Sequence, residues 1–245
     1  MGRPVLAEVL SKYVLPTAQF DGLCLEVRDA ERAATFWGLA LGGRIHTVGA
    51  GQFRIDPGPG RPAKEILRIN QVHEPPRENH RVHLDLRLPG PEPDHLIAAG
   101  ARLVRRAGSE PWHVLTDPEG NFFCAYPAVD DRPAGIFELV IKSRDAYAQA
   151  TWWCGVLGGE VVDEGEAAAV KAAPEFPWDF MLFDPVPEPK TAKNRLHWHL
   201  NLRDREPSAL IAAGATIRRQ PQTPDAAWVL ADPEGNEFCA FPTRS

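Results

Sequence analysis

The sequence predicts an α+β protein made of two tandem copies of one domain, each copy consisting of two βαβββ modules. The first indication is an internal repeat, because LIAAGA occurs at 96–101 and 210–215, and DPEGN occurs at 117–121 and 232–236. The offset is 114 residues for LIAAGA and 115 for DPEGN, which indicates duplication of a whole domain. The second indication is that each copy alternates between the two-residue periodicity of strands and the periodicity of amphipathic helices.

The repeat also sets the domain boundaries. We expect one domain at 20–127 and a second at 136–242, joined by a linker at 128–135 that contains charged residues and proline. Each domain has an ordinary size for an independent core. Residues 1–19 precede the first copy as an N-terminal extension, in which the pattern of Val5–Val14 is compatible with a short helix.

The first module of each copy begins with a strand and a helix. In the first copy, leucine and valine alternate with other residues over 23–27, which predicts a half-buried strand. Asp29 can cap a helix N-terminus, and an apolar helical stripe follows at Ala33, Phe36, Trp37, Ala40 and Leu41. Gly42 and Gly43 end this helix. Three strands are expected next, at 44–48, 52–56 and 65–70.

The second module repeats this plan. A strand is expected at 83–88, and a short helix is expected at 93–99, ended by Gly100. Asp117–Gly120 has the composition of a tight turn between the last two strands. The three remaining strands are expected at 103–106, 112–116 and 122–126. The second copy carries the same patterns.

Composition excludes several classes of function. The formal net charge is −6 and the pI is about 5.8, and no basic stretch is interleaved with aromatic residues, so we expect no nucleic-acid partner. No apolar run reaches the roughly 18 residues that a membrane span needs. The four cysteines form no Cys-x-x-Cys pair, which argues against a disulfide framework and a zinc-finger-type site. We expect a cytoplasmic protein with reduced thiols.

Several motifs together resemble a known superfamily. They are Phe36-Trp37 followed by Leu41-Gly42-Gly43, then HLDL at 83–86, LIAAGA, and DPEGN followed by a pair ending in cysteine. This combination resembles the vicinal oxygen chelate superfamily, which includes glyoxalases, bleomycin resistance proteins and dioxygenases, and in particular its glyoxalase-like domains. The resemblance implies modules whose sheets curl into a cup, with the helices outside and a small-molecule ligand inside. It also implies a monomer, because the fusion supplies the module pairing that single-domain relatives obtain by dimerising.

The same resemblance implies positions for metal ligands. In the first copy these positions hold Gly22, Asn70, His83 and Cys124, and in the second copy they hold Glu138, Asp184, His197 and Cys239. Metal-dependent relatives carry His, Glu or Gln there and close the last strand with Glu. Both copies here end in cysteine instead, and the first copy has no carboxylate, so the ligand set is degenerate.

Strand alternation indicates which residues face the cups, because successive side chains point to opposite faces of a sheet. The leucines of HLDL must meet the helices, so His83 and Asp85 face the cup, as do His197 and His199 in the second copy. The same argument places Glu138, Glu237, Cys124 and Cys239 on the concave side, and Trp112 and Trp228 are further candidates for this side. The second copy is richer in ionisable groups, and we expect its cup to carry any chemistry.

These positions support two main hypotheses. In the first, the cups bind or transform a small organic molecule without a metal, and the candidate ligand-binding residues are His83, Asp85, Cys124, Trp112, His197, His199, Cys239 and Trp228. In the second, the second copy alone is a metal-dependent lyase, isomerase or dioxygenase. Glu138 and His197 would then bind Zn²⁺, Fe²⁺, Ni²⁺ or Mn²⁺, with Glu237 or Asp184 as general base.

Less specific interpretations remain open for each candidate. The carboxylates could pair with Lys142 or Arg195, and the strand cysteines could be small buried hydrophobic residues. The two histidines could bond backbone carbonyls, and the tryptophans could belong to the core. A third hypothesis is therefore a structural or regulatory protein whose cups are filled by its own side chains.

Overall fold

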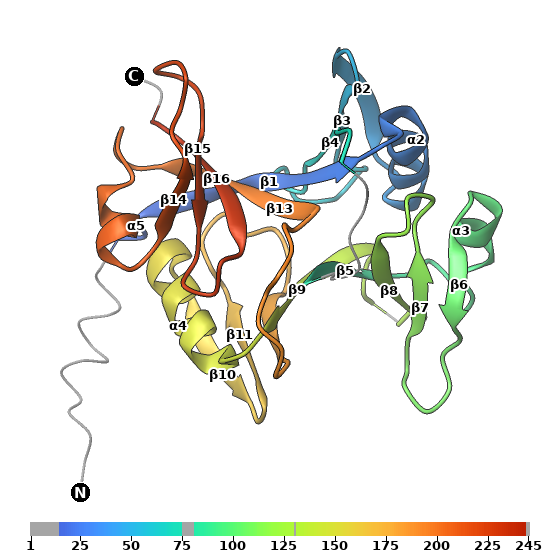
Figure 1. Cartoon of the computed structure of the whole chain (residues 1–245). Coiled ribbons are helices and arrows are strands. Elements are labelled where there is room, and N and C mark those ends of the chain that lie inside the picture. The colour runs from blue at the N-terminus through green and yellow to red at the C-terminus, as the bar shows by residue number, and fades with distance from the viewer. Residues whose placement is uncertain (1–14, 75–80, 130, 244–245) are drawn as a thin grey trace, which may run out of the picture.

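The computed structural model describes residues 15–74, 81–129 and 131–243 (Figure 1). The short helix considered at Val5–Val14 lies outside these residues. The first copy contributes β1 (Ala18–Val27), α2 (Ala30–Ala40), β2 (Arg44–Gly49), β3 (Gln52–Asp56) and β4 (Leu67–Gln71). It continues with β5 (Val82–Arg87), α3 (Asp94–Ala98), β6 (Arg102–Arg105), β7 (His113–Thr116) and β8 (Phe122–Tyr126).

The second copy repeats this order of elements. Its first module contains β9 (Gly135–Ser143), α4 (Ala146–Leu157), β10 (Glu160–Glu164), β11 (Ala167–Lys171) and β12 (Phe180–Pro185). Its second module contains β13 (Leu196–Leu202), α5 (Ser208–Ala212), β14 (Thr216–Arg219), β15 (Trp228–Ala231) and β16 (Glu237–Phe241). The predicted plan of four βαβββ modules is confirmed.

The modules of the two copies are interleaved. The strands form two eight-stranded sheets, in the orders β14-β15-β16-β13-β1-β4-β3-β2 and β10-β11-β12-β9-β5-β8-β7-β6. Each sheet therefore joins one module of the first copy to one of the second, through the antiparallel pairs β1/β13 and β5/β9. We call them the β1/β13 sheet and the β5/β9 sheet, and their concave sides the β1/β13 cup and the β5/β9 cup.

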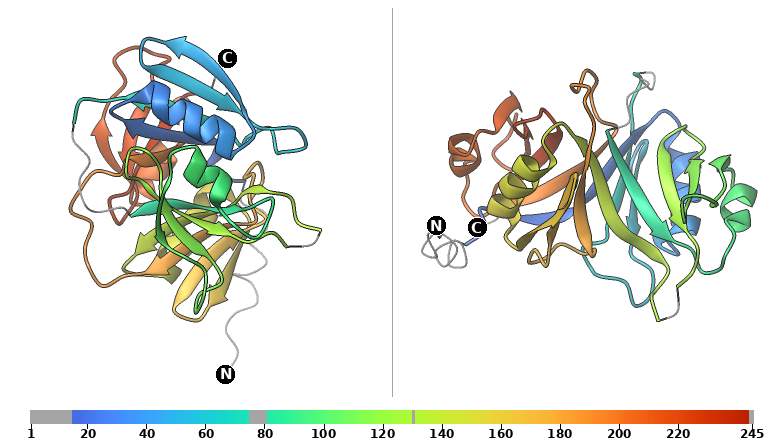
Figure 2. Two further views of the ribbon diagram at one scale, coloured as in Figure 1. Left: turned by 90° about the vertical axis from the view of Figure 1, so that its right-hand side faces the viewer. Right: turned by 90° about the horizontal axis from the view of Figure 1, so that it is seen from below.

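The helices lie outside the sheets, and those of one copy lie together. Figure 1 and the right-hand view of Figure 2 show α2 and α3 at one end of the molecule and α4 and α5 at the other. Helix α2 begins where the sequence predicts, because Asp29 Oδ1 accepts from the Arg32 amide at 3.0 Å. Asp145 Oδ1 caps α4 in the same way, accepting from the Ala148 amide at 3.0 Å. No helix among the described residues is long and apolar enough to cross a membrane.

The DPEGN turns connect the two modules within each copy. Asp117 is buried, and its Oδ2 accepts hydrogen bonds from Trp37 Nε1 at 3.0 Å and from Asn121 Nδ2 at 2.9 Å. Asp232 accepts from Trp153 Nε1 at 3.2 Å in the same way. Burial raises the pKa of both carboxyls, and these hydrogen bonds oppose that rise. Both copies thus contain the same buried polar contact between a helix and a turn.

Glu65 joins the two copies at another point. Its Oε2 accepts from Trp178 Nε1 of the second copy at 2.9 Å and pairs with Arg61 of the first. These contacts hold Glu65 in the loop, so the strand that we predicted over 65–70 begins at Leu67.

The predicted register of the strands is confirmed. Leu84 and Trp198 are at most 2% exposed and belong to the core beneath the helices, as do Leu139 and Ile141. His83 and His197 point the other way and line cavities on the concave sides. The alternation inferred from sequence therefore gives the correct face for both imidazole rings.

Candidate functional site

The β5/β9 cup contains a cavity with a volume of about 790 Å³. The cavity combines aromatic, aliphatic and ionisable side chains. Its lining includes His83, Asp85, Trp112, Cys124, Tyr126, Val140, Lys142, Leu182 and Asp184. Volume and composition are those of a site for a small organic molecule.

Two carboxyl groups lie side by side at the centre of this sheet. Asp85 on β5 is the register partner of Glu138 on β9, and the two residues are 3% and 9% exposed. Burial, and then the negative charge of Asp85, raise the pKa of Glu138 to about 8. Glu138 therefore carries a proton near neutral pH.

His83 and Cys124 flank this pair. His83 Nε2 lies 3.3 Å from Asp85 Oδ1, and Cys124 is the register partner of Asp85 on β8. Asp85 Oδ1 is buried and makes no hydrogen bond of good geometry within the described part of the chain. Burial and the charge of Asp85 raise the pKa of the Cys124 thiol, so it stays protonated and is not an activated nucleophile.

Aromatic and charged residues form the walls around the carboxyl pair. The rings of Trp112 and Tyr126 lie 5.3 Å apart with an interplanar angle of 31°. Lys142 and Asp184 are register partners on β9 and β12, and both line the cavity. A ligand in this cavity would thus meet two aromatic rings and side chains of both charges.

Two lysine–glutamate ion pairs lie in the β1/β13 cup. Lys193 Nζ lies 2.7 Å from Glu26 Oε1, and Lys190 Nζ lies 2.8 Å from Glu237 Oε2. Both lysines come from the segment between β12 and β13. Two cavities lie beside these pairs, one of about 170 Å³ that His197 and Cys239 line and one of about 470 Å³ that Lys190 and Val229 line.

A cluster of nitrogen and sulfur donors lies in the same cup. Cys24, His197 and His199 are all buried, and each offers one ligand atom within 4.8 Å of the others. Cys239 is the register partner of His199 on β16. Burial lowers the pKa of both histidines, that of His199 to about 2, so the rings are neutral.

The structure corrects our grouping of the predicted site residues by copy. Glu138 and Asp184 belong to the β5/β9 sheet, whereas His197, His199, Glu237 and Cys239 belong to the β1/β13 sheet. Glu138 and His197 therefore lie in different cups and cannot hold one metal ion, as the second hypothesis required. Alternation fixes the face on which a side chain lies, but it does not determine which modules pair.

The prediction for Trp228 was also wrong. Trp228 packs against the core, and its neighbour Val229 lines the β1/β13 cup. Trp112 does line the β5/β9 cavity. Val114 pairs with Cys124 and Val229 pairs with Cys239, so the two valines are equivalent. The residue directly before each valine is His113 in the first copy and Trp228 in the second, so His113 is the equivalent of Trp228.

Sequence analysis missed several residues of the two cups. Cys24 alternates with the leucines of β1 and could have been assigned to the concave face by the same argument as His83. Tyr126 lies two residues after Cys124 and shares its face. Lys190 and Lys193 belong to a connecting segment, and no periodic pattern could have placed them.

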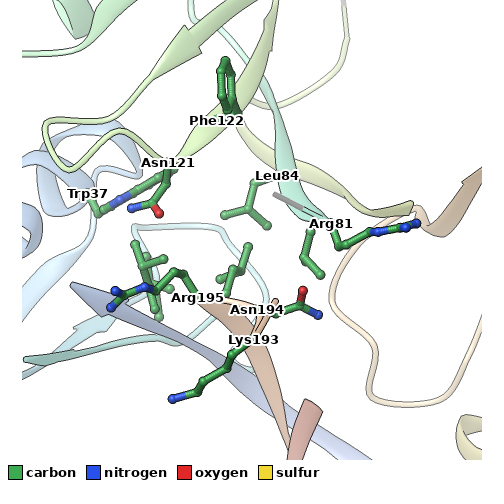
Figure 3. Close-up of a pocket in the computed structure, with 12 residues that line it drawn as sticks. Trp37, Arg81, Leu84, Asn121, Phe122, Lys193, Asn194 and Arg195 are labelled. Carbon is green, nitrogen blue, oxygen red and sulfur yellow. The ribbon is translucent and has the colours of Figure 1, made fainter. Parts of the chain in front are cut away.

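A small cavity between the two sheets is a weaker candidate (Figure 3). Its lining includes Arg81, Leu84, Asn121, Asn194 and Arg195. Its volume of about 20 Å³ has room for about one water molecule. This cavity is too small for an organic ligand.

The metal implied by the family resemblance can be compared with the donors in the β5/β9 cup. His83, Asp85 and Cys124 offer nitrogen, oxygen and sulfur atoms within 4.8 Å of one another. Asp85 Oδ1 is buried and makes no hydrogen bond of good geometry among the described residues, although His83 Nε2 lies 3.3 Å away, and buried carboxylates favour a cation. This donor set is compatible with a divalent transition metal.

Comparisons with known proteins agree with the fold. The glyoxalase-like domain family matches the chain twice, over residues 22–126 and 138–241. A mutant of glyoxalase I from Zea mays superimposes with a TM-score of 0.66 at 13% identity, covering 98% of this chain and 97% of that one. A putative dioxygenase from Bacillus subtilis superimposes with a TM-score of 0.62 at 12% identity, covering 93% and 86%. No curated protein sequence matches significantly.

At such low identities the two structures support the fold, whereas the double match covers most of the chain and identifies its sequence family. The chain belongs to the glyoxalase-like domain family and contains that domain twice.

Proposed function

We propose that this protein binds a small organic molecule in the β5/β9 cup and transfers a proton to or from it through the Glu138–Asp85 pair. The observation that carries the proposal is a cavity of about 790 Å³ lined by Asp85, whose register partner from the other copy, Glu138, bears a second buried carboxyl group. Sites for small ligands commonly have volumes of about 300–1,000 Å³ and a few polar groups in an apolar lining.

The chemistry follows from the protonation of Glu138. Because burial and Asp85 raise its pKa to about 8, Glu138 can donate a hydrogen bond or a proton to an oxygen of the ligand near neutral pH. Asp85 favours the return of that proton, since its negative charge opposes ionisation of Glu138. Trp112 and Tyr126 offer aromatic faces for a planar group. The proposed ligand class is therefore planar molecules that carry a carbonyl or hydroxyl oxygen.

A pair of matched variants tests this assignment. Val114 on β7 lines the β5/β9 cavity, and Val229 is its equivalent in the β1/β13 cup. Val114→Trp fills the proposed site, whereas Val229→Trp places the same bulk in the other cup. The ligands are a panel of aromatic aldehydes, naphthoquinones and catechols, and the measurement is the melting temperature against ligand concentration.

We expect at least one compound to raise the melting temperature of the wild type and of Val229→Trp, but not that of Val114→Trp. The assignment fails if no compound in the panel shifts the wild type, or if Val114→Trp responds as the wild type does.

A second candidate function is a metal-dependent lyase, isomerase or dioxygenase. It is favoured by the donors His83, Asp85 and Cys124, which replace the ligand set that we expected in the second copy. A bound metal would act as a Lewis acid on substrate oxygens. Elemental analysis after incubation with Fe²⁺, Ni²⁺, Mn²⁺ or Zn²⁺ tests it: His83→Ala should lose the ion that the wild type retains. Equal metal content in both proteins would remove this candidate.

A further inference from the structure

The β1/β13 cup contains three potential metal ligands that the proposed function does not use. Cys24 comes from the first copy, and His197 and His199 come from the second. Their ligand atoms all lie within 4.8 Å of one another, and the residues are 0%, 7% and 7% exposed. A central ion with bonds of about 2.0–2.3 Å would require only small movements of these side chains.

One of the donors lacks a partner. His199 Nδ1 is buried and has no hydrogen-bond partner in the described part of the chain. A buried polar atom without a partner costs free energy, so its burial needs an explanation. A neutral imidazole nitrogen with a free lone pair is a metal ligand.

The sulfur donor is positioned by a neighbouring strand. Asn70 Nδ2 donates to Cys24 Sγ at 3.2 Å, a contact of the kind that orients metal ligands. Cys239 on β16 is the register partner of His199 and lines the same cavity as His197. It is therefore a further sulfur donor on the neighbouring strand.

The surroundings favour a soft, closed site over an open one. The carboxylates of this cup are already paired, Glu26 with Lys193 and Glu237 with Lys190. The remaining donors are imidazole nitrogen and thiol sulfur, which is the donor set of structural zinc sites. Of the three donors, only His197 occupies a position that the family resemblance marks as a metal ligand.

We propose that the β1/β13 cup holds one zinc ion through Cys24, His197 and His199, with Cys239 as the candidate fourth ligand. The Cys24 thiol loses its proton to solvent when the Zn–S bond forms, and both imidazoles bind in their neutral form. Cys24 lies on β1, and the two histidines lie on β13. The ion would thus crosslink the two copies at the centre of their shared sheet.

Cobalt(II) is a suitable spectroscopic probe for this site. The full-length protein is stripped with a chelator, dialysed and titrated with Co²⁺, while the thiolate-to-cobalt charge-transfer absorption and the visible ligand-field bands are recorded. We expect both signals to saturate at about one ion per chain and to disappear on addition of Zn²⁺, which binds such sites more tightly.

Matched cysteine variants locate the ion. Cys24→Ser should abolish the charge-transfer band or reduce it at least tenfold, and His199→Gln should weaken cobalt binding by a similar factor. Cys124→Ser changes the β5/β9 cup and Cys154→Ser changes α4, so both should bind as the wild type does. Far-UV circular dichroism and melting curves of the metal-free variants establish that they fold.

The proposal is overturned if the wild type gives no charge-transfer band, or if folded Cys24→Ser retains it. Loss of the band in Cys124→Ser but not in Cys24→Ser would place the ion in the β5/β9 cup and would equally overturn it. Since ligand binding in the β5/β9 cup is tested with Val114→Trp, failure of the zinc site leaves that result unaffected.

Discussion

Asp85 of the first copy and Glu138 of the second face each other across the antiparallel pair β5/β9. Neither copy alone contains both carboxyl groups, so the proposed proton-transfer pair exists only because the modules are interleaved. The same applies to the β1/β13 cup, where Cys24 and His197 are register partners from different copies. Both sites are therefore properties of the duplicated chain.

The buried carboxyl pair predicts a dependence of stability on pH. Burial raises the pKa of Glu138 from 4.5 to about 8, so the folded state binds this proton more tightly than the unfolded state does. Its contribution is fully present below the unfolded pKa and is lost as the pH rises through about 8. At about 1.4 kcal/mol per pKa unit, this loss amounts to a few kcal/mol.

Glu138→Gln should remove this dependence of stability on pH, because glutamine imitates the protonated carboxyl group and does not ionise. The free energy of unfolding, measured with urea at several values between about pH 5 and pH 9, should fall more steeply for the wild type than for the variant. Parallel curves for the two proteins would contradict the raised pKa of Glu138.

The contact between helix α2 and the DPEGN turn predicts an effect on stability. Trp37→Phe removes the hydrogen bond from Nε1 to the buried Asp117 carboxylate, and we expect a loss of about 2 kcal/mol. Trp152→Phe is the control, since its Nε1 donates to the Ala213 carbonyl in a half-exposed position. Equal decreases in the free energy of unfolding of the two variants, measured by urea denaturation, would show that the buried carboxylate contact stabilises the protein no more than the half-exposed one does.

The contact of Glu65 with the second copy predicts a larger effect. Glu65→Gln leaves the mostly buried guanidinium of Arg61 without its counter-charge and should destabilise the protein by about 3 kcal/mol. Glu92→Gln removes an exposed ion pair with Arg106 and should cost less than about 1 kcal/mol. Thermal melts of the two variants at one pH make the comparison. A neutral Glu65→Gln substitution would be inconsistent with a buried ion pair.

Completion of both sheets within one chain predicts a monomer. Because β1/β13 and β5/β9 already pair internally, assembly with a second chain is not needed to form either cup. Light scattering on the purified protein should give a mass near 27.0 kDa. A stable mass of twice that value would contradict this prediction.

Much of the fold could be predicted from the sequence because it depends on local patterns. Alternation places Leu84 and Trp198 beneath the helices and His83 and His197 in the cups. A shift of one residue would turn the apolar side chains of a strand away from the helices, so the pattern permits one orientation of each strand. The side chains that face each cup were therefore largely accessible to sequence analysis.

The grouping of these side chains into sites was not accessible in the same way. Pairing β5 with β1 would satisfy alternation as well as pairing β5 with β9 does. The pattern therefore does not show that Glu138 on β9 and His197 on β13 lie in different sheets. For Trp228 the information was present: the DPEGN offset of 115 residues aligns Trp228 with His113, not with Trp112. A consistent offset would have avoided that error.

The interleaved topology has a consequence for any shortened form of the protein. A chain cut at the linker would give two fragments, and each fragment would carry half of both sheets and expose the backbone of β1 and β5, or of β9 and β13, as open edges. Open edges of this kind recruit other strands. Such fragments would be stable only after associating with each other or with a second molecule of their own kind. An unduplicated single-domain protein would complete its sheets in the same way, as a homodimer.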